Sequence, residues 1–458
     1  MTNKSIYRAY DIRGNTTTDL SVEIAYKIGY VFTKLTINAT NKVIVVGMDG
    51  RLSSPALCNG LISGLKNGGA EVVFIGLCST PMLYFADYKF KPAASVMITG
   101  SHNPKEDNGF KILQNNRPFF GEMIQELKRV IEGQKWSDIK IDNYLETIKI
   151  SDVSNDYVAA IINDSKFNRK LKVAIDTSNG AASEITKKLS QELPLDFIIF
   201  NDKIDGNFPA HNPDPMVAEN LTQLQKMVLE EQCDLGVCFD GDGDRIGVVT
   251  NSARIIYGDQ LLCIYAKQVL KHIQGATIIA DVKASDIFCS YVTKLGGKPL
   301  IWKTGHSYIK AKMQEIKAPL AGEMSGHVFF ADRYFGFDDG LYAAMRLLEI
   351  LANSDSSLDE MIGALPQMYN TPEIRIKVAE DKKFSLIKQI KQDMLRQGIT
   401  FNDIDGLRVE EKNGWWLLRS SNTEAAISIR IEATTKTGLE KLQNRLQKLL
   451  ANYNVYMI

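Results

Sequence analysis

Three aspartates separated by glycines form the run Asp240-Gly241-Asp242-Gly243-Asp244, directly after the apolar residues 235–239. A short apolar run of this kind predicts a buried strand. Glycine lets the backbone turn sharply, so the three carboxylates can converge on one point. Because like charges a few Å apart repel, the group needs a cation, and all-oxygen ligands favour Mg²⁺ or Ca²⁺. The run therefore predicts a metal site, with a solvated acidic turn as the alternative.

The spacing does not fit a helix–loop–helix calcium site. Arg245 stands where that loop needs a glycine for its sharp turn, and Asn251 stands where it needs a bidentate glutamate. A strand, not a helix, also leads into the run. Mg²⁺ is the better candidate, because it takes few protein ligands and completes its shell with phosphate oxygens.

A serine stands at a predicted turn in the run Thr99-Gly100-Ser101-His102-Asn103-Pro104, after an apolar stretch. A serine exposed at a turn and backed by N–H groups suits a nucleophile or a phosphate carrier. The hydrolase elbow is excluded, because Asn103 replaces the glycine that this motif needs. His102 is a candidate base, or else a solvated turn histidine. Lys111, expected on a strand after a turn at Asn108-Gly109, can return positive charge to the same cleft.

Two more polar loops have chemistry of their own. The run Gly322-Glu323-Met324-Ser325-Gly326-His327 is acidic, small and able to hydrogen-bond, which suits recognition of sugar hydroxyls; the alternative is a simple strand-to-helix turn. The run Arg419-Ser420-Ser421-Asn422-Thr423-Glu424 combines one arginine with three hydroxyls, which suits a phosphate clamp; the alternative is an ordinary polar turn. Together the four loops indicate phosphoryl transfer to or from a phosphorylated sugar. No Walker loop or kinase signature is present, so no nucleotide is implied.

The elements that must position these loops recur three times. Each unit opens with a short β-branched strand that ends near an aspartate, expected at Val43–Asp49, Val173–Asp176 and Ile278–Asp281. A helix and a second strand follow, the strand expected at Val72–Ile75, Phe197–Phe200 and Pro299–Trp302. A third strand then ends in a polar loop, at 99–103, 240–245 and 322–327. Ligands bind at the carboxyl ends of strands in α/β sheets, so units that face one another would open all three loops on one cleft. The alternative is that such sheets generally place glycine-rich turns after strands.

Strand and helix patterns alternate to about residue 365, which predicts three related α/β domains with mixed, mainly parallel sheets. From Pro372 the pattern changes to an alternating strand at Glu373–Val378, an amphipathic helix around residues 384–394 and a hairpin turn at Asn413-Gly414. A final helix carries Leu439, Leu442, Leu446 and Leu449. This last part predicts a C-terminal α+β domain. The expected domains are 1–148, 149–253, 254–366 and 367–458.

Composition excludes several classes of protein. The 458 residues hold 54 lysines plus arginines and 54 aspartates plus glutamates, so the net charge is zero and no basic excess points to nucleic acid or a membrane surface. No apolar run reaches the ~18 residues of a membrane span, and the N-terminal residues do not resemble a signal peptide. The six cysteines form no Cys-x-x-Cys pair, which indicates reduced core thiols in a cytoplasmic protein.

All four loops, in this order, resemble those of the α-D-phosphohexomutase family, closest to its bacterial phosphomannomutase/phosphoglucomutase group. The resemblance extends to three other runs: Tyr7-Arg8-Ala9-Tyr10-Asp11-Ile12-Arg13-Gly14, Asp281-Val282-Lys283 and Trp302-Lys303-Thr304-Gly305-His306. It covers essentially the whole chain. The resemblance implies a heart-shaped enzyme of four domains around a central cleft, with Mg²⁺ as cofactor and hexose 1,6-bisphosphate as intermediate and activator.

The resemblance also implies roles for single residues. Ser101 would carry a phosphoryl group and bind Mg²⁺ through it, together with Asp240, Asp242 and Asp244. The other catalytic residues would be Arg13, Lys111, Arg245 and His306, with proton transfer assigned to Lys111 and His306. The substrate would contact Tyr10, His102, Lys283, Glu323, Ser325, His327, Arg419, Ser421, Asn422 and Thr423, of which Glu323 and Ser325 would hold sugar hydroxyls and the last four a phosphate.

The expected reaction moves a phosphoryl group between the 1- and 6-positions of mannose or glucose phosphates. Met324 resembles the mannose/glucose group, and a glucosamine-phosphate mutase is the alternative. Two further alternatives are a phosphatase, which would hydrolyse the phosphoserine, and a non-catalytic sugar-phosphate binder. The expected partners are small hexose phosphates, without nucleic acid or membrane, and the chain is expected as a monomer or weak homodimer.

Overall fold

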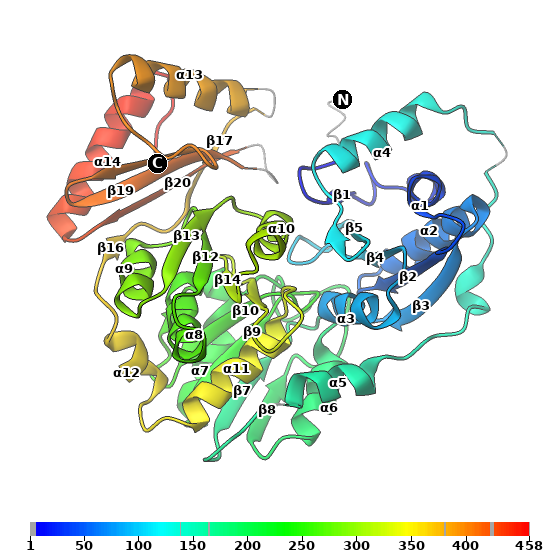
Figure 1. The fold of residues 1–458 in the computed structure, drawn as a ribbon, viewed down its shortest axis with the longest axis horizontal. Helices are drawn as coiled ribbons and strands as arrows, with labels where there is room; N and C mark the ends of the chain where they lie inside the picture. The colour runs from blue at the N-terminus through cyan, green and yellow to red at the C-terminus, as the bar shows by residue number, and fades with distance from the viewer. Residues whose placement is uncertain (1–5, 138, 164, 380–381, 422–425, 458) are drawn as a thin grey trace.

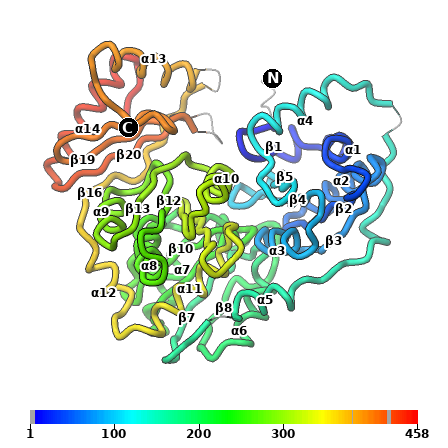
Figure 2. Tube along the Cα trace, in the orientation of Figure 1, coloured from blue at the N-terminus to red at the C-terminus, as the bar shows by residue number. Residues whose placement is uncertain are grey.

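The computed structural model describes residues 6–137, 139–163, 165–379, 382–421 and 426–457. These residues form four sheets with helices packed on them, arranged in an arc whose two ends are the first and the C-terminal domain (Figures 1 and 2).

The first sheet has the order β1-β5-β4-β2-β3, with the short β6 on β5. Its strands are β1 (Ile12–Asn15), β2 (Val43–Met48), β3 (Glu71–Leu77), β4 (Ala94–Ile98), β5 (Asp107–Gln114) and β6 (Arg117–Pro118). The helices of this part are α1 (Val22–Thr36), α2 (Ser54–Gly68), α3 (Thr80–Phe90) and α4 (Glu122–Gly133), followed by the short 3₁₀ helix η1 (Tyr144–Glu146). The expected turn at Asn108-Gly109 is wrong: both residues lie inside β5, because they pair with Gly14 and Arg13 of β1.

The second sheet has the order β11-β10-β9-β7-β8, and the third the order β13-β12-β14-β15. The second comprises β7 (Lys172–Asp176), β8 (Asp196–Phe200), β9 (Leu235–Phe239), β10 (Ile246–Thr250) and β11 (Ile255–Ile256), with α5 (Ser154–Ile162), α6 (Ser183–Gln191), η2 (Ala218–Leu221) and α7 (Thr222–Glu230). The third comprises β12 (Thr277–Asp281), β13 (Lys298–Trp302), β14 (Leu320–Gly322) and β15 (Val328–Phe330), with α8 (Gly258–His272), α9 (Asp286–Lys294), α10 (His306–Ile316), α11 (Gly340–Ala352) and α12 (Leu358–Gly363).

The threefold repeat is plain in the topology. In each of these sheets the first strand of the repeat pairs in parallel with the second and third, and the third continues through a polar loop into an antiparallel strand. The three loops therefore join β4 to β5, β9 to β10 and β14 to β15, at the same position of each sheet. The third loop connects two strands, so the strand-to-helix alternative is wrong. The prediction of three related α/β domains with mixed sheets is confirmed.

The C-terminal sheet is antiparallel, with the order β16-β20-β19-β18 and β17 also on β20. It comprises β16 (Tyr369–Asn370), β17 (Ile374–Lys377), β18 (Leu407–Glu411), β19 (Gly414–Ser420) and β20 (Ala426–Ala433), covered by α13 (Lys383–Arg396) and α14 (Lys436–Ala451). The predicted hairpin is present, but its turn falls one residue early, on Lys412-Asn413, since Glu411 pairs with Gly414. Gly414 is needed for packing: a Cβ there would lie 2.0 Å from the carbonyl oxygen of Glu432.

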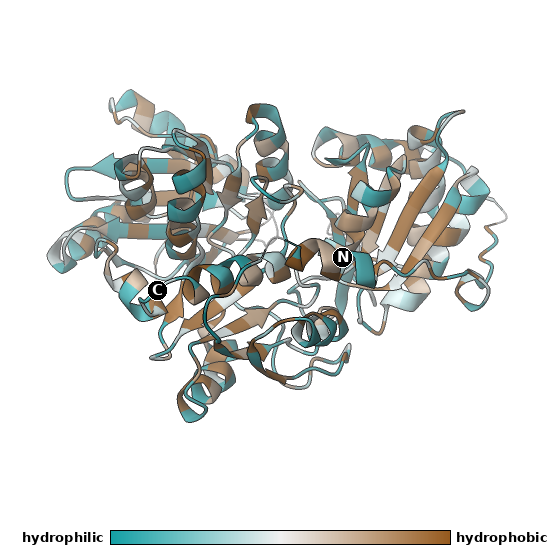
Figure 3. Cartoon of the chain, turned by 60° about the horizontal axis from the view of Figure 1, so that its bottom comes forward, coloured by the Kyte–Doolittle hydropathy of each residue, from teal (hydrophilic) through white to brown (hydrophobic). Residues whose placement is uncertain are grey.

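The strands are largely hydrophobic, whereas the helices around them carry both hydrophilic and hydrophobic residues (Figure 3). One continuous apolar cluster joins the second and third units and includes one face of the first, a second lies within the first unit, and a third lies between the C-terminal sheet and its helices. All six cysteines are free, as predicted, and five of them are buried. Among the described residues, none of the helices has the length and apolar character needed to cross a membrane.

The domain limits stay predictions. Strand β11 belongs to the second sheet although it lies beyond the expected boundary at residue 253. The C-terminal domain docks on the third through Arg408, whose guanidinium donates to the carbonyl oxygens of Val282 (2.9 Å) and Ala284 (2.8 Å) and stacks on the Trp415 ring. These contacts tie the C-terminal sheet to the backbone on both sides of Lys283.

Candidate active site

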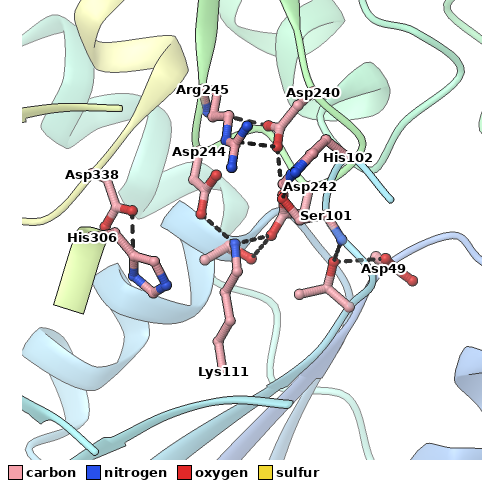
Figure 4. Close-up of polar contacts among 12 residues, drawn as sticks. Asp49, Ser101, His102, Lys111, Asp240, Asp242, Asp244, Arg245, His306 and Asp338 are labelled. Atoms are coloured by element: carbon pink, nitrogen blue, oxygen red, sulfur yellow. Dashed lines mark hydrogen bonds and ion pairs between the residues drawn. The ribbon is translucent and has the colours of Figure 1, made fainter. Parts of the chain in front are cut away.

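Most of the predicted residues line one cleft between the four sheets. Asp240, Asp242 and Asp244 do not line it but contact Ser101 and Lys111, which do. The space of the cleft is about 870 Å³, part of it open to solvent. Its lining includes Tyr10, Arg13, Ser101, His102, Lys111, Arg245, Lys283, His306, Glu323, Ser325, His327, Arg419 and Ser421. Asn422 and Thr423 lie outside the described residues. Figure 4 shows the part of the cleft around Ser101 and the aspartates.

Ser101 meets the aspartate loop across the boundary between the first and second sheets. Its Oγ donates to Asp240 Oδ2 at 2.9 Å and lies 3.2 Å from His102 Nδ1. Ser101 has a φ of +51°, a backbone conformation that non-glycine residues seldom adopt. In this conformation the hydroxyl points toward the aspartates, so the position of the serine is obtained at a cost in backbone strain.

Two residues that sequence reasoning did not assign to the site shape the serine loop. The Asp49 carboxylate accepts from Thr99 Oγ1 (2.8 Å) and from the Gly100 N–H (3.2 Å). The Arg51 guanidinium is 1% exposed and donates to four loop carbonyls, those of Ser101, Asn103, Pro104 and Asp107, at 2.6–2.9 Å. The sequence held one signal for both residues: Asp49 ends the expected first strand of the repeat, and Arg51 follows it by two residues.

The three aspartates are fully buried and lie close enough to share one ion. Asp242 Oδ1 and Asp244 Oδ1 are buried without a hydrogen-bond partner among the described residues. Burial, and then the charges of Asp242 and Asp244, raise the pKa of Asp240 well above its usual value. Three converging carboxylates, two of them with an oxygen that lacks a hydrogen-bond partner, are the kind of donor set that Mg²⁺ takes, so the residues fit this ion.

Lys111 is the counter-ion of this group. Its Nζ lies 2.6 Å from Asp242 Oδ2 and also pairs with Asp244. Burial disfavours the ammonium, but the charges of Asp242 and Asp244 outweigh it and raise the pKa of Lys111. Lys111 therefore stays charged at neutral pH, which suits charge compensation better than the acceptance of a proton.

Two histidines and a further aspartate lie beside the lysine. His327 Nδ1 is 3.0 Å from Asp338 Oδ2, and His306 Nδ1 is 3.8 Å from the same oxygen. Burial, and then the nearby Lys310 ammonium, keep the pKa of His306 well below its usual range. Arg245 Nε donates to His327 Nε2 at 3.0 Å, which places the His327 proton on Nδ1, toward Asp338. Sequence reasoning missed Asp338, whose only signal was its place just before α11.

Arg13 and Tyr10 line the cleft on the side of the first domain. Arg13 donates to the carbonyl oxygen of Gly100 at 2.7 Å and pairs with Asp11 at 2.8 Å. The Tyr10 ring meets the His306 ring edge-on, with centroids 5.7 Å apart. Arg13 thus adds a fixed positive charge beside the serine loop.

The third loop and the C-terminal sheet form the opposite wall. The Glu323 carboxylate accepts from the Gly305 N–H and, at 3.1 Å, from Ser325 Oγ. The pKa of Glu373 is lowered to about 2, and the charge of the Lys283 ammonium is the largest cause. Arg419 pairs with Asp405 at 3.0 Å, and Asp405 also accepts from the Thr304 N–H. This wall offers hydroxyl acceptors next to cations, as a sugar phosphate requires.

This fold and this site define an enzyme of phosphoryl transfer on phosphorylated sugars. The family models of phosphoglucomutase/phosphomannomutase match the chain in order: α/β/α domain I at residues 4–138, domain II at 155–253, domain III at 257–369 and the C-terminal domain at 373–449. Phosphomannomutase/phosphoglucomutase of Pseudomonas syringae pv. tomato is 43% identical over 439 residues, which cover 96% of this chain and 93% of that protein.

Two other comparisons agree. Phosphoglucomutase of Neisseria gonorrhoeae is 40% identical over 98% of this chain and 97% of its own length. The crystal structure of a phosphoglucomutase/phosphomannomutase family protein from Burkholderia thailandensis superposes with a TM-score of 0.89 at 39% identity, covering 99% of this chain and 98% of that one. The chain belongs to the phosphoglucomutase/phosphomannomutase family and is an isomerase that moves a phosphoryl group between positions of a hexose phosphate.

Proposed function

We propose that Ser101 carries the phosphoryl group while the enzyme interconverts the 1- and 6-phosphates of mannose and glucose. The observation that carries this proposal is the hydrogen bond of 2.9 Å from Ser101 Oγ to Asp240, beside two unpartnered carboxylate oxygens. The test is Ser101→Ala, which should abolish conversion and leave binding of the sugar phosphate largely intact.

Asp240, Asp242 and Asp244 would hold Mg²⁺, the ion their oxygens fit, together with an oxygen of the phosphorylated serine. When bound, the ion supplies positive charge that neutralises the transferring phosphoryl group. The chain adds Arg13 and Lys111 on the same side of the cleft. Lys111 would leave its aspartate partners in part when the ion binds, and so become available to the phosphoryl oxygens.

The reaction then balances in two transfers. The substrate's free hydroxyl attacks the phosphorus of phosphoserine, and its proton passes to neutral His306. The bond from phosphorus to Ser101 Oγ breaks, and this oxygen leaves as an alkoxide, which is the nucleophile of the second transfer. The resulting hexose 1,6-bisphosphate turns over in the cleft, its other phosphate returns to Ser101, and the histidine returns the proton. We assign proton transfer to His306 and withdraw Lys111, because the lysine holds its proton between two carboxylates.

Substrate choice rests on the wall opposite the serine. Glu323 and Ser325 would hold the sugar hydroxyls, and Arg419 with Ser421 the phosphate that is not reacting; Asn422 and Thr423 keep the roles expected for them. Mannose and glucose differ only at the C2 hydroxyl, so a loop that holds other hydroxyls accepts both. The names of several relatives include both phosphomannomutase and phosphoglucomutase. A coupled assay of mannose, glucose and glucosamine 1-phosphates at matched concentrations tests this choice.

The rival readings have separate outcomes. A phosphatase would release free phosphate from glucose 1-phosphate without forming glucose 6-phosphate. A non-catalytic binder would bind hexose phosphates without converting them. We also keep the predictions of a cytoplasmic monomer or weak homodimer that binds hexose phosphates and neither nucleic acid nor membranes; sedimentation of the purified chain tests the oligomeric state.

A further inference from the structure

One segment of the second domain lies against the loop that carries the serine in the first. This segment, residues 201–217 between β8 and η2, is named the strap. At Gly206 the strap approaches the first domain so closely that a Cβ would lie 2.6 Å from the Leu52 backbone nitrogen. The Phe208 ring faces the Arg51 guanidinium, with 5.0 Å from Cζ to the ring centroid. Asn212 Nδ2 donates to the carbonyl oxygen of His102 at 3.3 Å.

The strap is anchored in its own domain by a buried aspartate. Asp176, which ends β7, lies 2.9 Å from His211 Nε2 through Oδ2 and accepts from Asn201 Nδ2 through Oδ1 at 3.0 Å. Asn179 adds a hydrogen bond from its Nδ2 to the carbonyl oxygen of Lys203 at 2.9 Å. The start of the strap and His211 are therefore fixed to the second sheet, whereas Phe208, between them, and Asn212, next to His211, touch the first domain.

The residue that the strap touches is the one that shapes the serine loop. Arg51 donates to the carbonyl of Ser101 at 2.7 Å and to three further loop carbonyls. Phe208 has a φ of +51°, a conformation that costs about 1 kcal/mol or more for a residue with a bulky side chain. Its ring is 9% exposed. The ring makes a cation–π contact with the Arg51 guanidinium, which favours the orientation in which the guanidinium reaches the loop carbonyls.

We infer that the strap is a positioning element: it fixes the serine loop of the first domain relative to the aspartate loop of the second. Phe208 acts through Arg51, and Asn212 acts through the backbone of His102. The alignment matters because phosphoryl transfer needs the serine oxygen in line with the phosphorus, and a displacement of 1 Å costs about a hundredfold in rate. The inference rests on the proposed role of Ser101 as phosphoryl carrier.

The experiment compares Phe208→Leu with Phe208→Tyr, which keeps the ring face, and with Ala210→Ser, an exposed control in the same strap. The readouts are kcat and KM for glucose 1-phosphate, and the rate at which dephosphorylated enzyme takes up phosphate from glucose 1,6-bisphosphate, followed by intact mass. Phe208→Leu should lower kcat and the phosphorylation rate by about tenfold with KM within about twofold, because the substrate is held by other loops. Phe208→Tyr should recover most of both rates.

A second variant keeps the inference open to refutation if Phe208→Leu does not fold. Asn212 is exposed, so Asn212→Ala should fold normally and lower the phosphorylation rate by about threefold. Unchanged rates in both variants, or a change in KM alone, would contradict the positioning role of the strap. The two proposals fail separately: turnover by Ser101→Ala would overturn the carrier role, whereas full activity of Phe208→Leu beside an inactive Ser101→Ala would overturn the strap only.

Discussion

Ser101 of the first domain and Asp240 of the second are joined by a hydrogen bond of 2.9 Å from Oγ to Oδ2. The two residues are 139 positions apart in the chain and lie in loops that follow strands of different sheets. A hydroxyl so placed beside buried acids has the position that the proposed phosphoryl carrier requires, with a cation next to it. The arrangement of both domains is therefore part of the chemistry.

Removal of the metal should stop the reaction. Treatment with EDTA should lower turnover of glucose 1-phosphate below detection, and excess Mg²⁺ should restore it, because Asp242 and Asp244 carry oxygens without a hydrogen-bond partner and Asp240 lies beside Ser101. The coupled assay measures this directly. Full activity in EDTA would remove the metal role of Asp240, Asp242 and Asp244.

Lys111→Met should unfold more easily than the parent chain. It leaves Asp242 and Asp244 buried without their cation, a loss of about 3–5 kcal/mol in the free energy of unfolding. Mg²⁺ should then stabilise the variant more than it stabilises the parent, since the ion supplies the missing charge. Urea unfolding with and without Mg²⁺ measures both effects. Lys89→Ala, which breaks an exposed ion pair with Asp156, serves as the control and should change stability by less than about 1 kcal/mol. Equal responses of the two variants to Mg²⁺ would refute the compensation.

Arg51→Lys should slow phosphorylation of Ser101 and lower stability by about 3 kcal/mol, since one ammonium cannot reach the carbonyls that the guanidinium holds. Mass spectrometry of enzyme mixed with hexose 1,6-bisphosphate gives the rate. Lys105→Ala, an exposed change in the same loop, should leave it unaltered. If both variants react alike, Arg51 does not shape the loop.

The topology of the three sheets followed from the alternation of apolar runs with polar loops, because that alternation reports buried parallel strands directly. The predictions were wrong where local side-chain preferences do not determine the backbone conformation. The dipeptide Asn108-Gly109 suggests a turn, but pairing with β1 keeps it in a strand. Arg51, Phe208 and Asp338 escaped notice because their importance comes from what lies opposite them in space, and no local spacing encodes that.

Asp87 should make stability depend on pH below neutrality. Burial raises the pKa of its carboxyl to about 6 in the folded chain, above the unfolded value of about 3.9. The folded state therefore binds this proton more tightly, so the contribution of Asp87 to stability is greatest below pH about 4 and falls by about 3 kcal/mol as pH rises through about 6. Urea unfolding of the parent chain and Asp87→Asn across this range measures the difference. A difference that stays constant with pH would show that the carboxyl titrates normally.

The carrier role of Ser101 has the most direct test. Dephosphorylated enzyme is mixed with glucose 1,6-bisphosphate in Mg²⁺, and the phosphorylated residue is identified by peptide mass spectrometry while turnover of glucose 1-phosphate is followed. We predict phosphate on Ser101 alone, appearing in step with activity, and neither phosphate nor turnover in Ser101→Ala. Turnover without phosphate on Ser101 would contradict the account.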